Sequence, residues 1–415
     1  MERKRINVLY NRKPIENVPG VFIIVLLTIA TISAGAIDLP GLPVEITGEI
    51  SPYYWLNLTE TQKEVKGRRV TDTERKYYNG FNVKTAYLGF DFDVTENIDA
   101  ELTLYYSEDT DDFIRYAYVG LDNLIPRHKL YLGLVKMPWV DYEDGIWGWR
   151  NVKHVGVDEF DFVDESDYGI GVEGTVVKGY VQHHVTFTNG RGFEPGGDYY
   201  GNERGKDVEY RVTFFLPPTS GFFAGLSING LVHYGNLFAD EYTFYWHAGD
   251  VDLTFGPFTE LCYGGLVSFE HGFFTLGAGY FEHIRGRILH EYHEDPPYHE
   301  PYYKDVKSRL ITGYGTAHLS GWFGLLGRFD LVDPDTGRRD EKYTPYWDES
   351  FDAYLDVTAG AGFTFYEGHF KFVPNYQTRF PEMRYNIAEN QYEDYHPAYF
   401  VTTEHRFYVN MDLIF

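Results

Sequence analysis

Cysteine, basic residues and helical periodicity are all scarce in this chain of 415 residues. The single cysteine, Cys262, excludes an intramolecular disulfide and a multi-cysteine metal site. Lys and Arg number 36 against 62 Asp and Glu, and the resulting charge of −26 argues against binding to nucleic acid. No stretch of ten or more residues places apolar side chains at i, i+3, i+4 and i+7, so amphipathic helices are not expected.

Long hydrophobic runs are also missing, except near the amino terminus. VFIIVLLTIATISAGA (21–36) carries no charge over sixteen residues, follows a segment with five basic residues and ends on small side chains. This is the pattern of a secretory signal peptide, and it is shorter than the about 20 residues that a spanning helix needs. We therefore expect residues 1–36 to be a signal peptide, cleaved near Ala36, and residues 37–415 to form one domain.

What the chain has in abundance is tyrosine (37), phenylalanine (32) and glycine (43), which favour strands and turns. Apolar and polar side chains alternate in segments such as VEYRVTFFL (208–216), FGLLGRFDLV (323–332) and LDVTAGAGFTF (355–365). Segments of about ten alternating residues indicate strands of a transmembrane β-barrel, in which only every second side chain faces lipid. The mean hydropathy of −0.36 agrees with this interpretation.

The joints between these segments alternate in length. Short joints lie at 95–97, 177–179, 217–221, 320–322 and 366–368. Long joints lie at 59–80, 138–166, 190–206, 286–305, 334–350 and 380–400. A transmembrane barrel has short periplasmic turns and long outer loops, whereas a soluble sandwich has no reason to gather its long loops at one end. The pattern predicts an all-β, antiparallel outer-membrane barrel.

The number of strands depends on residues 237–285. Taking 237–257 as one long outer loop gives sixteen strands, with every long joint outside. Taking VDLTFGPFTEL (251–261) as a hairpin requires an extra strand and leads to eighteen. We favour sixteen and keep eighteen open; either number encloses an aqueous channel.

Several segments resemble one known family. They include YYNGFNVKTAYLGFDFDVTENI (77–98), RYAYVGLDNLIPRHKLYLGLVKMPW (115–139), SDYGIGVEGTV (166–176), KDVEYRVTFFLPP (206–218), GRFDLVDPDTG (327–337) and FKFVPNYQTRF (370–380). Together they resemble the phosphate-selective porin O and P family of Gram-negative bacteria. The resemblance implies a sixteen-stranded, usually trimeric channel whose third long loop folds inward and narrows the lumen.

The charge of the long loops departs from that family, whose phosphate-binding members line the pore with arginines. Acidic side chains crowd SEDTDD (107–112), DYED (141–144) and DEFDFVDESD (158–167). Such loops would repel anions from the mouth of a channel. We therefore expect a cation-leaning or weakly selective pore rather than one for phosphate.

The third long loop, PWVDYEDGIWGWRNVKHVGVDEFDF (138–162), is the candidate constriction. It holds the basic residues Arg150, Lys153 and His154 and the acidic residues Asp141, Glu143 and Asp144. A ring of fixed charge at a narrowing selects which ions pass. The alternative is that the bases pair with these acids and hold the shape of the loop.

Other basic residues occupy positions on strands where the alternation turns them toward the lumen. These are Arg211, Arg328, Lys371 and Arg379. A cation that faces lipid near the midplane of the membrane costs about 2–4 kcal/mol, which favours the inward orientation. Whether they contact solute, pair with acids such as Glu209 and Asp330, or only keep the channel hydrated is left open.

Metal binding and catalysis have little support. LHEYHEDPPYHE (289–300) combines His290, His293 and His299 with carboxylates, but its spacing is not an established zinc pattern. We expect no metal and no cofactor. There is no G-x-S-x-G, H-E-x-x-H or P-loop motif, so we expect no enzyme. A hydrolase assembled from separate strands, and a barrel that serves as a surface adhesion or scaffold protein, are the alternatives.

The last ten residues, RFYVNMDLIF, alternate once more. The apolar positions are Phe407, Val409, Met411, Leu413 and Phe415. A final strand that ends on an aromatic residue resembles the signal read by the barrel-assembly machinery. We expect a bacterial outer-membrane porin, in contact with lipid, assembled as a homotrimer, and passing ions or small hydrophilic solutes by passive diffusion.

Overall fold

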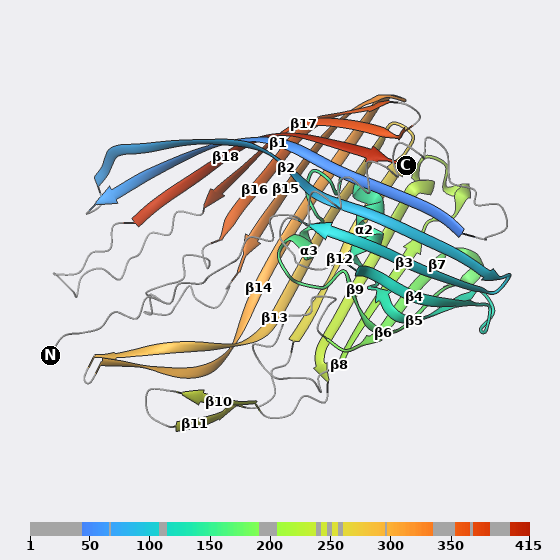
Figure 1. The fold of residues 1–415 in the computed structure, drawn as a ribbon, viewed down its shortest axis with the longest axis horizontal. Coiled ribbons are helices and arrows are strands. Elements are labelled where there is room, and N and C mark those ends of the chain that lie inside the picture. The colour runs from blue at the N-terminus through green and yellow to red at the C-terminus, as the bar shows by residue number, and fades with distance from the viewer. Residues whose placement is uncertain are drawn as a thin grey trace.

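In the computed structural model a ring of tilted strands surrounds two short helices (Figure 1). The structure describes residues 44–65, 68–107, 114–190, 206–237, 242–246, 251–255, 260–294, 297–334, 353–365, 368–381 and 399–415. Within these residues, sixteen strands form a closed antiparallel barrel. The expected signal peptide, 1–36, lies outside them. None of the helices among the described residues has the length and apolar character needed to cross a membrane.

The strands of the barrel follow the order of the sequence. Their bounds are β1 (Val44–Val65), β2 (Arg68–Thr95), β3 (Ile98–Ser107), β4 (Ile114–Asp122), β5 (His128–Lys136), β6 (Ser166–Val176), β7 (Val181–Thr188), β8 (Lys206–Phe215), β9 (Leu226–Leu237), β12 (Glu260–His271), β13 (Phe274–Glu294), β14 (Pro297–Ser320), β15 (Phe323–Asp333), β16 (Tyr354–Phe365), β17 (Phe370–Pro381) and β18 (Tyr399–Ile414). The other elements are the α-helices α2 (Val140–Trp147) and α3 (Gly156–Glu159), the 3₁₀ helices η1 (Val177–Gly179) and η2 (Pro218–Gly225), and the hairpin strands β10 (Tyr242–Trp246) and β11 (Val251–Phe255).

The ambiguous segment 237–285 is resolved in favour of sixteen strands. β9 pairs directly with β12, as in Leu231 with Gly264. β10 and β11 pair only with each other and form a separate two-stranded sheet outside the barrel. The alternative hairpin at 251–261, and with it the count of eighteen, is therefore wrong. The strand pattern at 251–255 belongs to β11, which pairs with β10 and not with a strand of the barrel.

Alternation along each strand separates an inner from an outer face. On β15, Arg328 and Asp330 are buried inside the barrel, whereas Phe329 and Leu331 are exposed on the outside. β8 repeats the pattern, with Arg211 buried and Phe214 exposed. The exposed apolar face is the one that the sequence pattern assigns to lipid.

Two expected outer loops are not loops over most of their length. β1 and β2 continue as a paired ladder up to Val65 and Arg68, through the predicted loop 59–80. β13 and β14 likewise continue up to Glu294 and Pro297, through the predicted loop 286–305. These strands extend well past the rest of the ring (Figure 1). Backbone hydrogen bonds between neighbouring strands continue the ladder beyond the end of the apolar alternation. The prediction from the alternation therefore began both loops too early in the strand.

The final strand closes the ring against the first. β18 pairs with β1, and the backbone N–H groups of Gly48 and Phe415 donate to each other's carbonyl oxygens at 2.8 and 2.9 Å. Phe407 and Leu413 are exposed on the outer face, and Asn410 and Asp412 are buried on the inner face. The ring of Phe415 lies over Gly48, where a β-carbon would come within 2.3 Å of it.

Candidate constriction site

The segment that joins β5 to β6, residues 137–165, lies inside the barrel and is called the constriction loop below. It carries α2 and α3, both of which lie within the ring of strands (Figure 1). Its first turn is fixed by Trp139, which is fully buried. The backbone N–H of Trp139 donates to Oε1 of Glu209 on β8 at 3.0 Å, and its indole ring meets the ring of Phe281 on β13 edge-on at 5.3 Å.

An apolar core joins this loop to the inner wall. Its buried members from the loop are Trp139, Val140, Ile146, Trp147, Val152, Val155, Val157, Phe162 and Val163. Its buried members from the strands are Leu231, Cys262, Leu266, Phe281, Leu310, Tyr314, Leu326, Val332 and Val373. The lumen of a channel-forming barrel is mostly polar, so this apolar patch distinguishes the wall that carries the loop. Burial at about 25 cal/mol per Å² of apolar surface makes the docking of the loop a substantial part of the fold.

Arg211 also binds the start of the loop. Its side chain is 2% exposed, and its Nε donates to the carbonyl oxygen of Pro138 at 2.7 Å. The guanidinium group lies 4.0 Å from the centre of the Tyr142 ring, within the range of a cation–π contact. Arg211 thus faces inward, but it is enclosed by the loop instead of being open to solute.

Glu143 is a buried carboxyl group on α2. The indole N–H of Trp139, one helical turn earlier, donates to its Oε2 at 2.6 Å. Burial raises the pKa of Glu143 to about 7, against the opposing influence of this hydrogen bond and of Arg328. The loop therefore packs best when Glu143 carries a proton.

Arg150 holds the two ends of the loop together. Its guanidinium group contacts Asp144, and lies 2.8 Å from a carboxylate oxygen of Glu165 and 3.3 Å from one of Asp158. Glu165 is also paired with Arg115 on β4. Burial opposes the charge of Asp158, yet Arg150 lowers the pKa of that carboxyl to about 2. The cation is therefore neutralised within the loop.

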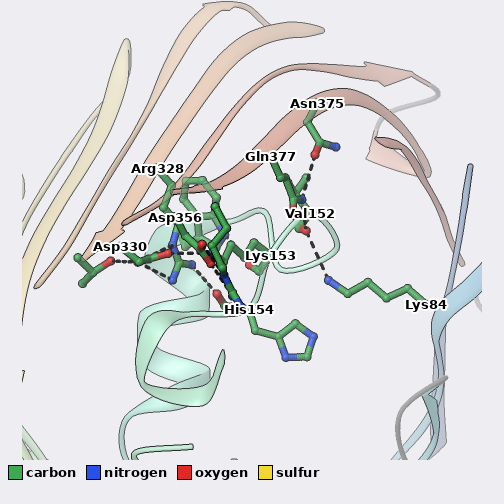
Figure 2. Close-up of polar contacts among 12 residues, drawn as sticks. Lys84, Val152, Lys153, His154, Arg328, Asp330, Asp356, Asn375 and Gln377 are labelled. Carbon is green, nitrogen blue, oxygen red and sulfur yellow. Dashed lines mark hydrogen bonds and ion pairs between the residues drawn. The ribbon is translucent and has the colours of Figure 1, made fainter. Parts of the chain in front are cut away.

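The middle of the loop is joined to the wall by side chains of alternating charge. Nζ of Lys153 lies 3.1 Å from a carboxylate oxygen of Asp330 and 3.1 Å from one of Asp356. Nε of Arg328 donates to Asp330 at 2.9 Å, and Nε of Arg379 donates to Asp356 at 2.8 Å. Figure 2 shows Lys153 close to both aspartates. We call these five residues, Arg328, Asp330, Lys153, Asp356 and Arg379, the charge ladder.

Backbone carbonyl groups of the loop reach further around the ring. Lys84 on β2 donates to the carbonyl oxygen of Val152 at 3.4 Å, and Gln377 on β17 donates to the same oxygen at 3.1 Å (Figure 2). Asn410 on β18 donates to the carbonyl oxygen of Asn151 at 2.7 Å. The loop is thus bonded to strands from both ends of the sequence and crosses the lumen.

Three solved structures match this chain over nearly their whole length. An anion-selective porin from Comamonas acidovorans matches with a TM-score of 0.51 and 12% identity, over 90% of this chain and 99% of that chain. OmpF of Salmonella typhi, in complex with daunomycin, matches with a TM-score of 0.52 and 10% identity, over 92% of this chain and 100% of that chain. OmpT of Vibrio cholerae, expressed in the outer membrane, matches with a TM-score of 0.51 and 10% identity, over 91% of this chain and 99% of that chain. The chain has the fold of a porin.

The likeness establishes the porin fold and not the solute, because identities near 10% do not carry a binding site from one chain to another. No family model and no curated protein matches the chain. The resemblance to the phosphate-selective porin O and P family therefore stays a prediction.

The structure of this porin fold places the predicted loop bases beside acids, though mostly different acids from those expected. Arg150 does contact Asp144. Lys153 instead reaches Asp330 and Asp356 on the wall, and Nδ1 of His154 lies 3.0 Å from Asp158. The remaining two predicted acids pair elsewhere: Glu143 accepts from Trp139, and Asp141 accepts from the hydroxyl group of Tyr116 at 2.8 Å.

The four predicted strand bases all lie on the inner side of the wall. Arg211 and Arg328 are buried against the loop. Lys371 is partly exposed, with its ammonium group 6.0 Å from the Trp149 ring. Arg379 belongs to the charge ladder. The sequence did not predict four residues that form ion pairs with the loop or within it: Arg115, Glu165, Asp158 and Asp356. The alternation along β4 and β16 indicates that Arg115 and Asp356 face inward, but it does not show which inward residue contacts the loop.

The exposed charges of the constriction loop are all negative among its described side chains. Glu159, Asp161 and Asp164 are exposed, whereas Arg150 and Lys153 are enclosed by carboxylates. A solute in the lumen therefore meets acids on this loop first.

No group of three or more His, Cys, Asp or Glu side chains is arranged to hold a metal ion among the described residues. The histidine-rich segment 289–300 continues the ladder of β13 and β14 instead of forming a loop. Its side chains lie outside the described part of the structure, as does the acidic loop at 108–113.

Proposed function

We propose that the chain is an outer-membrane porin through which ions and small hydrophilic solutes diffuse passively. The observation that carries the proposal is a closed ring of sixteen strands whose β5–β6 loop folds into the lumen. A ring of this size encloses more space than its own side chains fill, and a loop docked within it narrows the path. No covalent chemistry and no cofactor are required.

We further propose that the pore is cation-leaning. The constriction loop exposes Glu159 and Asp161, and its cations Arg150 and Lys153 are paired. Fixed charge at a narrowing acts strongly on passing ions, because the surrounding wall has a low dielectric constant. The net charge of −26 adds a long-range field of the same sign.

Planar-bilayer recording of the refolded residues 37–415 tests both proposals. Stepwise conductance with a reversal potential that favours K⁺ over Cl⁻ is expected. The absence of conductance steps would contradict the channel, and a preference for Cl⁻ or phosphate would contradict only the cation preference. The phosphate arm also tests the resemblance to the phosphate-selective family.

Location and assembly complete the proposal. Residues 1–36 would direct secretion, and the strand that ends at Phe415 would direct insertion into the outer membrane by the barrel-assembly machinery. Fractionation, heat-modifiable gel mobility and chemical cross-linking test the location, the folded barrel and the homotrimer in turn. A protein that stays in the inner membrane, shows no heat modification or cross-links only as a monomer would contradict the corresponding part.

A specific observation favours a second candidate, a scaffold barrel with a plugged lumen. The apolar core between loop and wall, and the hydrogen bonds that carry the loop to β2 and β18, resemble the docking of a plug. The same recordings distinguish the two: a plugged scaffold shows no steps until the loop is displaced. A hydrolase is the third candidate, and detection of ester or peptide cleavage by the refolded barrel would favour it.

A further inference from the structure

A small pocket lies on the inner wall beside the charge ladder, where β16, β17 and β18 approach the constriction loop. We call it the vestibule pocket; its charged lining residues are Lys153, Glu159, Asp356, Arg379 and Arg406. Asp356 lies near the start of β16 and Arg379 near the end of β17. Both positions are near the ends of strands that meet long joints, and Lys153 and Glu159 of the constriction loop complete the pocket.

Arg379 is held in a position from which it can receive a ligand. Its Nε and Nη2 donate to the two carboxylate oxygens of Asp356 at 2.8 and 2.9 Å. Its guanidinium group lies 4.2 Å from the centre of the Tyr354 ring. This arrangement uses one edge of the guanidinium group, and the opposite edge, with Nη1, is not used by Asp356. Its side chain is still 43% exposed, unlike that of Arg328, which is 1% exposed.

A second cation and an anion border the same space. Arg406 on β18 is the register neighbour of Gln377 on β17, and both line the pocket. Glu159, at the end of α3, is exposed and interacts electrostatically with Arg379. Asp356 is already matched by Lys153 and Arg379, so Glu159 is the pocket carboxylate with charge to offer a ligand. The pocket is thus bordered by the guanidinium group of Arg379 and by the carboxylate of Glu159.

We propose that the vestibule pocket binds a small zwitterion of the α-amino acid type, with its carboxylate on Arg379 and its ammonium group on Glu159. Arginine binds a carboxylate through two parallel hydrogen bonds, which fixes orientation as well as charge. Inorganic phosphate lacks the ammonium group that Glu159 would bind, so we expect it to bind less tightly than the zwitterion. The proposal names a solute class for the channel and rests on the proposed porin function.

The closing experiment measures binding without conduction. Ligand-observed NMR titrations of the refolded barrel in detergent compare alanine with its two halves, propionate and ethylamine, and with inorganic phosphate. Alanine is expected to bind tightest. Arg379→Gln should weaken the binding of alanine and of propionate by about tenfold, because it removes one charged hydrogen-bond pair. Glu159→Gln should weaken alanine but not propionate, because only alanine carries the ammonium group.

Lys178→Gln is the matched control, since this exposed lysine lies on η1, in a short turn, and has the same charge change. Alanine binding that is no tighter than that of both halves, or tighter binding of phosphate, would overturn the proposal. So would an Arg379→Gln effect no larger than that of the control. Glu159→Gln keeps the test decisive if Arg379→Gln does not fold, because Glu159 is exposed. If alanine binds but no conductance steps are seen, the proposed channel is wrong and the pocket is not. If conductance steps are seen but alanine does not bind, the proposed pocket is wrong and the channel is not.

Discussion

The indole ring of Trp149 lies directly against Gly362 on β16, where a β-carbon would come within 2.1 Å of the ring. Its N–H also donates to the hydroxyl oxygen of Thr316 on β14 at 2.9 Å. The loop therefore fits its wall by shape as well as by charge, and only glycine leaves room for this contact.

A side chain at residue 362 should displace the constriction loop. Gly362→Val places two methyl groups in the space of the Trp149 ring, and overpacking of this kind costs about 1–3 kcal/mol. We expect larger and noisier conductance steps in planar bilayers. Trp149→Ala in the same chain should restore quiet steps, since it removes the clash. If the double variant is as noisy as Gly362→Val alone, the contact does not hold the loop.

Loss of the Lys153 ammonium group should loosen the charge ladder. Lys153→Met leaves Asp330 and Asp356 buried, although each keeps an arginine partner. We expect a cost of about 2 kcal/mol, as for a hydrogen bond between charged groups. Denaturant titration of the barrel in detergent measures it, with Lys178→Gln as the control. Equal stability of Lys153→Met and the control would show that the ladder does not stabilise the docked loop.

The docking of the loop should depend on pH through Glu143. Burial raises the pKa of Glu143 from its usual 4.5 to about 7 in the folded chain, so the folded state binds the proton more tightly than the unfolded one. The group contributes stability that is fully present below pH 4.5 and is lost as the pH rises toward 7. The size of the effect is on the order of 3 kcal/mol.

Conductance noise recorded between pH 5 and pH 8 measures this dependence. Noise should increase with pH as Glu143 loses its proton, and Glu143→Gln should remain quiet throughout, because an amide cannot ionise. A wild-type profile that is flat, or one that the Glu143→Gln variant reproduces, would rule out Glu143 as the titrating group.

Two exposed acids of the loop should set part of the ion preference. Burial and neighbouring acids raise the pKa of Asp164 to about 7, so at pH 8.5 Asp161→Asn with Asp164→Asn removes two negative charges that are exposed on the loop. We expect the reversal potential in a KCl gradient to shift toward that of Cl⁻. Glu96→Gln, on the short turn between β2 and β3, changes an exposed acid far from the loop in sequence and serves as the control. No shift, or the same shift in the control, would mean that the preference arises elsewhere.

The sequence predicted the ring well and the loop contacts poorly, and the reason is the range of the interactions. Alternation on β8 and β15 depends on which side of one strand meets lipid, so Arg211 and Arg328 could be assigned to the inner face from their neighbours alone. The partner of Lys153 could not, because Asp330 and Asp356 are about two hundred residues away along the chain.

The sequence by itself determined a barrel of alternating strands with long and short joints, because period-two patterning is written residue by residue. The tertiary structure decided three further features. These are the length of the β1–β2 and β13–β14 ladders, the exclusion of β10 and β11 from the ring, and the apolar core beneath the constriction loop. Each depends on backbone pairing or on contacts between distant strands, and only the closed ring brings those segments together.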